Sequence, residues 1–211
     1  MKYKVPFDGC VFSTHPQGSV TQWFAENPLL YRGVCNPTGC LKYHNGIDLV
    51  APWGTPIKAV STQKIVEIKN TLEGYGKHLR ALDERFEWVY GHLSRIDCKI
   101  GQTLSQGGQL GLMGNTGFVV SGATPYWKAN PFKGTHLHLG AREYQKAQPN
   151  LTYESGDRVQ ILNYNNGVFG SVNIEELFAE TPVETEVRLH LTIQSLTNVV
   201  IALLKKLVDK K

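Results

Sequence analysis

The sequence predicts a mainly β protein built on an antiparallel sheet, with an α-helix at its C-terminus. Up to about residue 145, short β-branched or aromatic runs alternate with turn residues from a total of 21 glycines and ten prolines, which favours strands. Residues 19–24 fit an edge or entry strand. The runs 74–82 and 86–94 fit two antiparallel partners, because only a short acidic linker joins them. After residue 180, apolar residues recur every three or four positions, the period of a helix.

Composition narrows the class of protein. The chain of 211 residues has room for one sizeable core, and its 41% hydrophobic and 19% charged residues match neither a disordered chain nor a membrane protein. The net charge of +4 favours anionic partners such as cell-wall polymers or nucleic acid. Since no basic run with interleaved aromatic residues is present, we predict no nucleic-acid partner.

Two histidine motifs have the spacing of metal ligands. His136 and His138 would point to the same side of a strand, roughly 6 to 7 Å apart at the backbone. An H-x-H pair also arises by chance on exposed strands, so its weight comes from His44 and Asp48, four residues apart in a second cluster. Imidazole and carboxylate are ligands that Zn²⁺ accepts, and a set of three leaves one coordination position open.

A further histidine is a candidate base. Strand alternation would put His92 on the same face as Tyr90 and Trp88, in a partly apolar pocket where a neutral imidazole can accept a proton. The alternative is a histidine that only packs in the core. His78 is interpreted as a surface residue.

The four cysteines contain no C-x-x-C pair, so we expect no separate structural zinc site. Residues 36–39 have the composition of a type I turn, which would bring Cys35 and Cys40 together. Either a disulfide or two reduced thiols beside a loop would fit. Cys10 and Cys98 are expected in the core or at its edge.

The glycine-dense segment 107–117 lacks the spacing of a P-loop and the βαβ context of a dinucleotide site. We therefore expect no nucleotide site. Its glycines are predicted to let a tight turn pass close to the metal cleft.

Four motifs in order resemble the lysostaphin and LytM-type zinc metallopeptidases of bacterial cell walls. They are His44-x-x-x-Asp48, Tyr90-Gly91-His92-Leu93-Ser94, Gly114-Asn115-Thr116-Gly117 and His136-Leu137-His138. The resemblance covers roughly residues 18 to 145. It implies that residues 1–145 form a zinc peptidase domain with the antiparallel β-fold of that family, a duplicated hybrid motif.

The resemblance also implies a role for five residues. His44, Asp48 and His138 would bind one Zn²⁺ per chain, and His92 and His136 would act in catalysis. The implied activity is that of a zinc endopeptidase that hydrolyses peptide bonds in the stem or cross-bridge of peptidoglycan. The alternative is a non-catalytic module that binds the wall, activates another hydrolase or forms part of a phage particle. Degenerate relatives lose metal or catalytic residues and none is missing here, so we favour the enzyme.

The site of action is expected to be the bacterial cell wall, with peptidoglycan peptides as partners. Two lysines at the N-terminus are followed by no apolar segment of the necessary length, so no secretory signal is visible. That pattern would suit a phage endolysin delivered without the general export route, although a trimmed chain would look the same.

One segment departs from the family pattern. Relatives pass from the Asn-Thr-Gly turn to H-x-H through a few residues, whereas here 118–133 intervene. This insertion could be an aromatic loop that walls the cleft or a surface loop packed on its own aromatic residues.

The C-terminal part divides into two predicted segments. Residues 146–180 are rich in Asn, Gly and Tyr and are expected to cross back over the domain as turns and extended chain. Residues 181–211 are predicted to form an amphipathic helix that starts at the capping box 181–184, although 187–193 also alternate like a strand. The uncharged stretch 189–204 is too short and too polar to span a bilayer. We expect the apolar stripe to pack on the body or on a second copy, with membrane-surface docking as the alternative.

Overall fold

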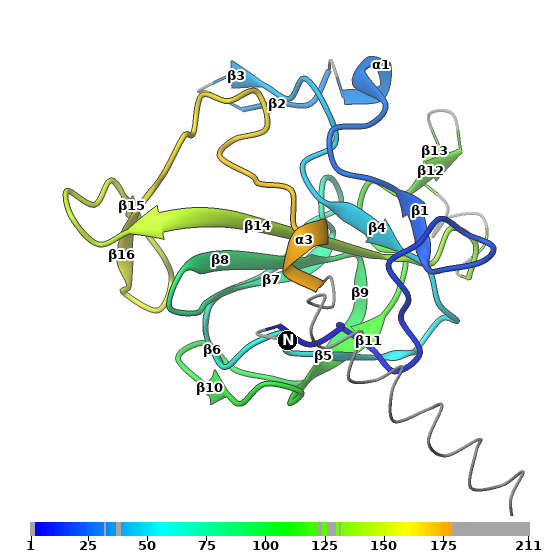
Figure 1. Ribbon diagram of the computed structural model, residues 1–211, viewed down its shortest axis with the longest axis horizontal. Coiled ribbons are helices and arrows are strands. Elements are labelled where there is room, and N and C mark those ends of the chain that lie inside the picture. The colour runs from blue at the N-terminus through cyan, green and yellow to red at the C-terminus, as the bar shows by residue number, and fades with distance from the viewer. Residues whose placement is uncertain are drawn as a thin grey trace, which may run out of the picture. The chain divides into compact units, whose positions relative to one another are not determined.

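The computed structural model describes residues 3–31, 33–36, 39–121, 124–125, 130 and 132–178. Antiparallel strands form most of it, as the sequence predicts, and they assemble into one large and one small sheet (Figure 1). In spatial order, the path of the large sheet is β1 (Val20–Gln22), β4 (Ile47–Leu49), β14 (Leu137–Gln145), β8 (Phe86–Gly91), β7 (Lys77–Leu82), β6 (Gln63–Asn70) and β10 (Thr103–Leu104). The small sheet has the order β5 (Pro56–Lys58), β11 (Gln109–Met113) and β9 (Leu93–Ile96).

The remaining elements are short. They are the hairpins β2 (Cys35–Asn36) with β3 (Gly39–Cys40) and β12 (Val120–Ser121) with β13 (Thr124–Pro125), the pair β15 (Leu151–Thr152) and β16 (Arg158–Ile161), and the helices α1 (Pro28–Tyr31) and α3 (Glu175–Phe178). Within the described residues, no helix is long and apolar enough to cross a membrane.

Strand alternation gives the central strands two different faces. Leu137, Leu139 and Ala141 of β14 are buried and belong to the main core, and Tyr90 is the antiparallel partner of Leu139. Each large apolar side chain buried in this way stabilises the fold by about 1.5 to 3 kcal/mol. The opposite face of the same strands carries polar residues and forms the floor of a cleft.

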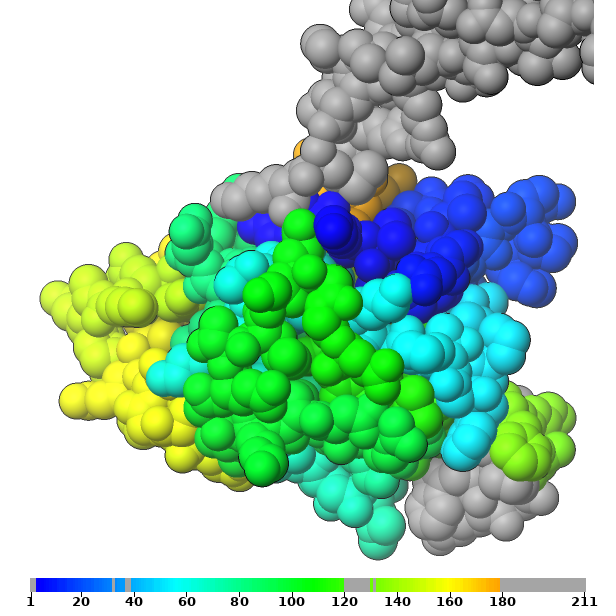
Figure 2. All heavy atoms as spheres, turned by 90° about the horizontal axis from the view of Figure 1, so that it is seen from below, coloured from blue at the N-terminus to red at the C-terminus, as the bar shows by residue number. Residues whose placement is uncertain are grey.

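The small sheet and the edge strand β10 of the large sheet lie in the lower part of Figure 1. Figure 2 views the molecule from that side, where the green segment that includes β10 and β11 covers the centre of the surface. The glycine-dense segment turns at its two ends, where Gly107 and Gly117 have φ of 85° and 80°, but its middle forms the strand β11 instead of a turn. The physical reason is that Gly111 and Gly114 let the backbone of this segment pass close to β9: a Cβ atom at Gly111 would lie 2.2 Å from the carbonyl oxygen of Arg95.

The strand predictions at the start of the sheet are confirmed. β1 stands at one end of the strand order, as expected for an edge strand, and β7 pairs with β8 with Leu79 opposite Tyr90. The prediction that His78 lies on the surface is wrong, since only 5% of it is exposed. Its Nδ1 lies 2.8 Å from the carbonyl oxygen of Gly76, and burial lowers the pKa of its imidazole.

The cysteines fall into two groups. Cys35 and Cys40 form a disulfide that closes the β2–β3 hairpin, which decides between the two alternatives. Cys10 and Cys98 are buried free thiols, as predicted for core or edge residues. Burial raises the pKa of Cys10 to about 12 and that of Cys98 to about 11, so both are protonated and unreactive at neutral pH.

Residues 146–178 add strands and core contacts to the sheet. β16 pairs with the end of β14, and Tyr153, Val159 and Ile161 pack in a second small core with Val66 and Leu82. The helix α3 brings Phe178 into the main core. The predicted helix over 181–211 lies outside the described residues.

Candidate metal centre

Three predicted ligands meet at the junction of β4 and β14. His44 precedes β4, and Asp48 of β4 is the antiparallel partner of His138 of β14. His44 Nε2 lies 3.0 Å from His138 Nδ1 and 3.2 Å from Asp48 Oδ1, and the distance from His138 Nδ1 to Asp48 Oδ1 is 3.1 Å. The three residues form a group whose ligand atoms could hold one metal ion.

Glycines make room for this group. A Cβ atom at Gly46 would lie 2.6 Å from the imidazole of His138, so a larger residue at position 46 would displace that ring. Gly91 of β8 faces His138 across the strand pair, and its Cβ atom would lie 3.2 Å from Cβ of His138. The close approach of strands and ring therefore depends on residues without a side chain.

The three atoms fit a tetrahedral divalent cation. Metal–nitrogen bonds of about 2.0 to 2.1 Å give ligand–ligand edges of about 3.3 to 3.4 Å in a tetrahedron, close to the observed edges of 3.0 to 3.2 Å. His44 Nδ1 faces the carbonyl oxygen of Trp23 at 2.9 Å. Because a carbonyl oxygen only accepts, Nδ1 carries a proton, and in the neutral ring Nε2 has the lone pair that could bind a metal ion.

The carboxylate and the imidazoles of this group shift one another's pKa values. Burial raises the pKa of Asp48, but the charges of His136 and His44 and the hydrogen bonds from His138 and His44 outweigh burial and hold that pKa well below its usual range. Burial lowers the pKa of His138 to about 4 against the opposing effect of Asp48. Asp48 and His138 are thus in the protonation states that metal binding requires. Burial lowers the pKa of His44, but Asp48 outweighs burial and raises that pKa, so metal binding would compete with a proton at His44.

The two predicted catalytic histidines lie beside this group. The ring centres of His92 and His136 are 4.6 Å apart, and that of His92 lies 6.1 Å from that of His138. His136 Nε2 lies 3.6 Å from Asp48 Oδ2. The structure therefore brings all five predicted site residues together.

His92 reaches the site by a route that alternation does not predict. β8 ends at Gly91, and His92 adopts a left-handed backbone with φ of 62°. The prediction that His92 shares a face with Tyr90 is wrong, because this conformation breaks the alternation and Tyr90 Oη instead accepts hydrogen bonds from Val60 and Gln63. A non-glycine residue held in this region is strained by about 1 to 3 kcal/mol, and such residues cluster at functional sites.

Both catalytic candidates are held in one tautomer. Nδ1 of His92 faces the carbonyl oxygen of Thr116 at 2.7 Å, and Nδ1 of His136 faces that of Gly134 at 2.8 Å. Each Nδ1 therefore carries a proton, and the neutral form of either ring has its lone pair on Nε2. Burial, followed by the charges of His136 and His138, holds the pKa of His92 well below its usual range, so His92 is neutral at pH 7.

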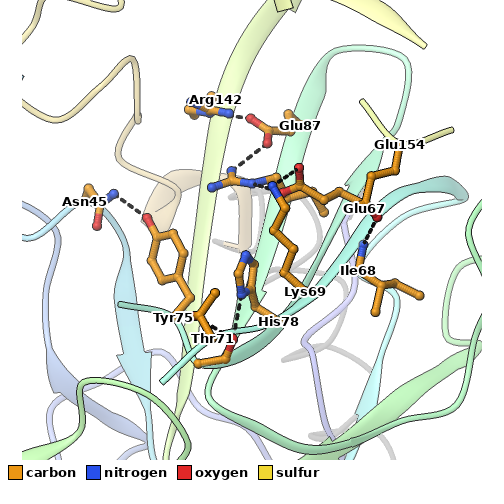
Figure 3. Close-up of polar contacts among 12 residues, drawn as sticks. Asn45, Glu67, Ile68, Lys69, Thr71, Tyr75, His78, Glu87, Arg142 and Glu154 are labelled. Atoms are coloured by element: carbon orange, nitrogen blue, oxygen red, sulfur yellow. Dashed lines mark hydrogen bonds and ion pairs between the residues drawn. The ribbon is translucent and has the colours of Figure 1, made fainter. Parts of the chain in front are cut away.

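Three side chains of the site were not predicted. The ring of Tyr75 lies 4.9 Å from that of His138, and its hydroxyl accepts a hydrogen bond of 2.6 Å from Asn45 Nδ2 (Figure 3). Tyr31 stacks on His44 with ring centres 5.4 Å apart. The Gly-Tyr-Gly pattern of residues 74–76 indicates a turn, but no local pattern shows that Tyr75 reaches the three metal-ligand candidates.

A cavity of about 580 Å³ extends from the metal group over the polar face of the large sheet. Residues of the β2–β3 hairpin and of 164–171 line it together with Phe118 and Val119. The first residues of the insertion thus contribute to the cleft wall. Phe132, near its end, instead packs edge-on against Trp53, and most of the segment between them lies outside the described residues.

Comparison with known proteins identifies the family. The sequence profile of Peptidase family M23 matches residues 42–150, about half of the chain. An uncharacterized metalloprotease of Haemophilus influenzae is 33% identical over 81 residues, which are 38% of this chain and 17% of that protein. The glycyl-glycine endopeptidase ALE-1 of Staphylococcus capitis is 35% identical over 78 residues, 36% of this chain and 21% of that protein. The DD-carboxypeptidase/endopeptidase Mpg of Neisseria meningitidis is 30% identical over 129 residues, 56% of this chain and 26% of that protein.

The chain thus spans about a quarter or less of the length of these relatives. Among solved structures, the catalytic domain of lysostaphin from Staphylococcus simulans is 25% identical, with 59% of this chain and 79% of that chain covered and a TM-score of 0.46. The profile match and these relatives agree with the motifs noted in the sequence. The chain belongs to peptidase family M23, in its lysostaphin and LytM-type branch.

Proposed function

We propose that the chain is a zinc metalloendopeptidase that hydrolyses peptide bonds in the stem or cross-bridge of bacterial peptidoglycan. The observation that carries the proposal is the convergence of His44, Asp48 and His138 on one point, with His92 and His136 beside them. The site of action would be the cell wall. Relatives named as glycyl-glycine endopeptidase and DD-carboxypeptidase/endopeptidase support a wall peptide as substrate.

The donor set favours Zn²⁺ over other common ions. Two imidazole nitrogens and one carboxylate oxygen suit Zn²⁺, whereas Ca²⁺ and Mg²⁺ select sites built from oxygen. His44, Asp48 and His138 would hold one ion per chain, with one coordination position open for water or substrate. In such a site Zn²⁺ polarises a peptide carbonyl as a Lewis acid and lowers the pKa of water to about 7.

The two remaining histidines provide acid–base chemistry. Nδ1 of His92 and Nδ1 of His136 each donate a hydrogen bond to a carbonyl oxygen, so the lone pair of each neutral ring lies on Nε2. Such an atom can accept a proton from the attacking water, and the resulting imidazolium can stabilise the oxyanion and return the proton to the leaving amine. No H-E-x-x-H motif is present, so the histidines replace the glutamate of that motif.

Metal analysis tests the ligand set. We expect about one zinc ion per chain in the purified wild-type protein and much weaker zinc retention in His138→Ala, because a third of the protein ligands is lost. The matched control is His15→Ala, which removes an exposed loop histidine and should leave the metal content unchanged. Full zinc occupancy at the site in His138→Ala would exclude His138 as a ligand.

Hydrolysis of purified walls separates catalysis from metal binding. His92→Ala and His136→Ala should keep metal and fold but lose activity by about 10²- to 10⁴-fold, the usual contribution of an acid–base group. Mass spectrometry of released fragments from walls of defined cross-bridge gives both the rate and the bond that is cut. Near-normal turnover in either variant would exclude that histidine from catalysis. A zinc-loaded wild-type protein that releases no fragment from any wall would support the non-catalytic module instead.

A further inference from the structure

The floor of the cleft continues beyond the metal group along β14. His138, Gly140 and Arg142 lie on the same face of this strand, because alternate residues share a face. Four residues of strand span about 13 Å, so Arg142 lies roughly that far along the floor from the ligand His138. Arg80 and Glu87 line the same cavity next to Arg142.

Glu87 orients two guanidinium groups in this part of the cleft. It stands opposite Arg142 in the pairing of β14 with β8, and its carboxylate accepts hydrogen bonds from Arg142 Nε and, at 2.6 Å, from Arg80 Nη1 (Figure 3). Only 1% of the Glu87 side chain is exposed. The carboxylate therefore fixes the direction of both arginine side chains.

Arg142 has hydrogen-bond donors that Glu87 does not use. A guanidinium carries five N–H donors, and Glu87 accepts from Nε alone. Within the described part of the chain, neither Nη1 nor Nη2 of Arg142 has a hydrogen-bond partner. The side chain is 13% exposed and lines the cavity, so a ligand in the cleft can reach these donors. In the free protein these donors can hydrogen-bond water in the cleft, and an acceptor group of a ligand could take the place of that water.

The charge of this end of the cleft is positive. Arg80 and Arg142 share the single carboxylate of Glu87, and Glu67 behind Arg80 is divided between Arg80 and Lys69. Burial raises the pKa of Glu87, but the charges of both arginines outweigh burial and lower that pKa to about 2. Glu87, Arg80 and Arg142 are all charged at neutral pH. The three side chains together carry one net positive charge, which a negatively charged ligand could neutralise.

Two segments of the chain form the wall of the cleft at its Arg142 end. Asn36 of the β2–β3 hairpin donates a hydrogen bond of 3.2 Å to Tyr164 Oη, and Tyr164 stacks on Phe169. Ser171 forms a β-bridge with Arg142 itself. Figure 1 shows the hairpin beside the chain that leads from β16 towards α3. A ligand that reaches Arg142 therefore ends there or turns away.

We infer that Arg142 binds a carboxylate of the substrate peptide, about four residues from the bond positioned at the metal centre. The inference rests on the proposed function and defines its substrate class: a peptide whose carboxylate, terminal or on a side chain, occupies the bounded end of the cleft. Arginine is suited to this role because its planar fork binds a carboxylate with two parallel hydrogen bonds.

Equilibrium binding tests the inference without requiring turnover. The zinc-loaded full chain is titrated by calorimetry with acetylated pentaalanine as the free acid, as the carboxamide, and as a carboxamide with glutamate at the last position. We expect the free acid to bind about tenfold to a hundredfold more tightly than the carboxamide, the range for hydrogen bonds to a charged group. If the glutamate peptide binds like the free acid, the site accepts a side-chain carboxylate, and if it binds like the carboxamide, the site requires a chain terminus.

A variant identifies the residue responsible. Arg142→Lys keeps a positive charge beside Glu87 but loses the fork, so it should remove most of the preference for the acid. Arg85→Lys is the matched control, because Arg85 forms an exposed pair with Glu143 outside the cavity, and it should keep the preference. A preference that survives in Arg142→Lys would assign the carboxylate to another group, such as the metal ion, and would overturn the inference.

The remaining outcomes separate this inference from the proposed function. Equal binding of acid and carboxamide by the wild-type protein, or no binding of any of the peptides, would overturn the carboxylate subsite even if walls are hydrolysed. A clear preference for the acid together with no release of wall fragments would keep the subsite and reject the peptidase activity.

Discussion

Glu87 combines deep burial with two charged partners. A carboxylate removed from water is unfavourable unless opposite charges and hydrogen bonds compensate for the lost hydration. Arg142 and Arg80 provide both, so the pKa of Glu87 falls to about 2 although burial alone would raise it. A group whose pKa is lowered on folding stabilises the folded state above its unfolded pKa, and it loses that contribution as the pH falls through the folded value.

The first prediction at this scale concerns Glu87→Gln. The substitution leaves two buried guanidinium groups without their shared carboxylate, so we expect the free energy of unfolding at pH 7 to fall by about 3 kcal/mol. The difference between wild type and variant should shrink between about pH 4.5 and pH 2, where the wild-type carboxylate becomes protonated. Urea unfolding at pH 7 and pH 3 measures it.

Glu143→Gln is the matched control for Glu87→Gln. Glu143 pairs with Arg85 at the surface, where an ion pair contributes at most about 1 kcal/mol. A loss of stability in Glu87→Gln that is the same at both pH values would show that packing, rather than charge, is responsible.

At the scale of elements, the strand β14 contributes side chains both to the core and to the cleft. One face of this strand supplies Leu137, Leu139 and Ala141 to the core, and the other supplies His138 and Arg142 to the cleft. The helix α3 does not reach the cleft, but it packs on the core side of the large sheet. Its Phe178 stacks on Phe12 with ring centres 4.4 Å apart and contacts Trp88.

A second prediction follows for Phe178→Ala. Phe178 is 5% exposed, so its removal leaves a cavity in the main core and should lower the free energy of unfolding by about 3 to 5 kcal/mol. Phe132→Ala is the control, because Phe132 is 63% exposed and its loss should change stability by about 1 kcal/mol or less. Thermal unfolding measures both. A neutral effect of Phe178→Ala would mean that Phe178 is not part of the folded core.

At the scale of the whole molecule, the described core closes with residues up to Phe178. The remaining residues carry the predicted amphipathic helix, for which an apolar stripe up to about 45 Å long is expected at 1.5 Å per residue. A stripe of that length exceeds what a lone helix needs to seal one small domain, and exposed apolar surfaces of this kind mark interaction sites. Self-association through this helix therefore stays a prediction.

Truncation after Glu180 tests it. The shortened chain should keep zinc binding and peptide cleavage, because all five residues assigned to the site precede this point, while light scattering should give a lower oligomeric mass. If the full-length chain is a monomer and the truncated chain unfolds, the stripe belongs to the intramolecular core and the association hypothesis is wrong.

The sequence by itself determined the class of fold and the family. The signals used were local. They were turn residues between short β-branched runs, and histidine or aspartate pairs two or four positions apart, which share a face because a strand turns alternate side chains to alternate faces. They were enough to predict neighbouring strands within 74–82 and 86–94 and to select His44, Asp48 and His138 as candidate ligands. Their roles came from the family resemblance, since spacing does not state which nitrogen or oxygen atoms meet.

Only the tertiary structure decided which distant residues share a site. Asp48 and His138 are 90 residues apart, and their register depends on the pairing of β4 with β14. The left-handed backbone at His92 depends on the break between β8 and β9, which alternation does not predict. The contact of Arg142 with Glu87 arises in the same way, because strand pairing and burial depend on the whole fold, whereas a local pattern reports only the direction in which each side chain leaves its own strand.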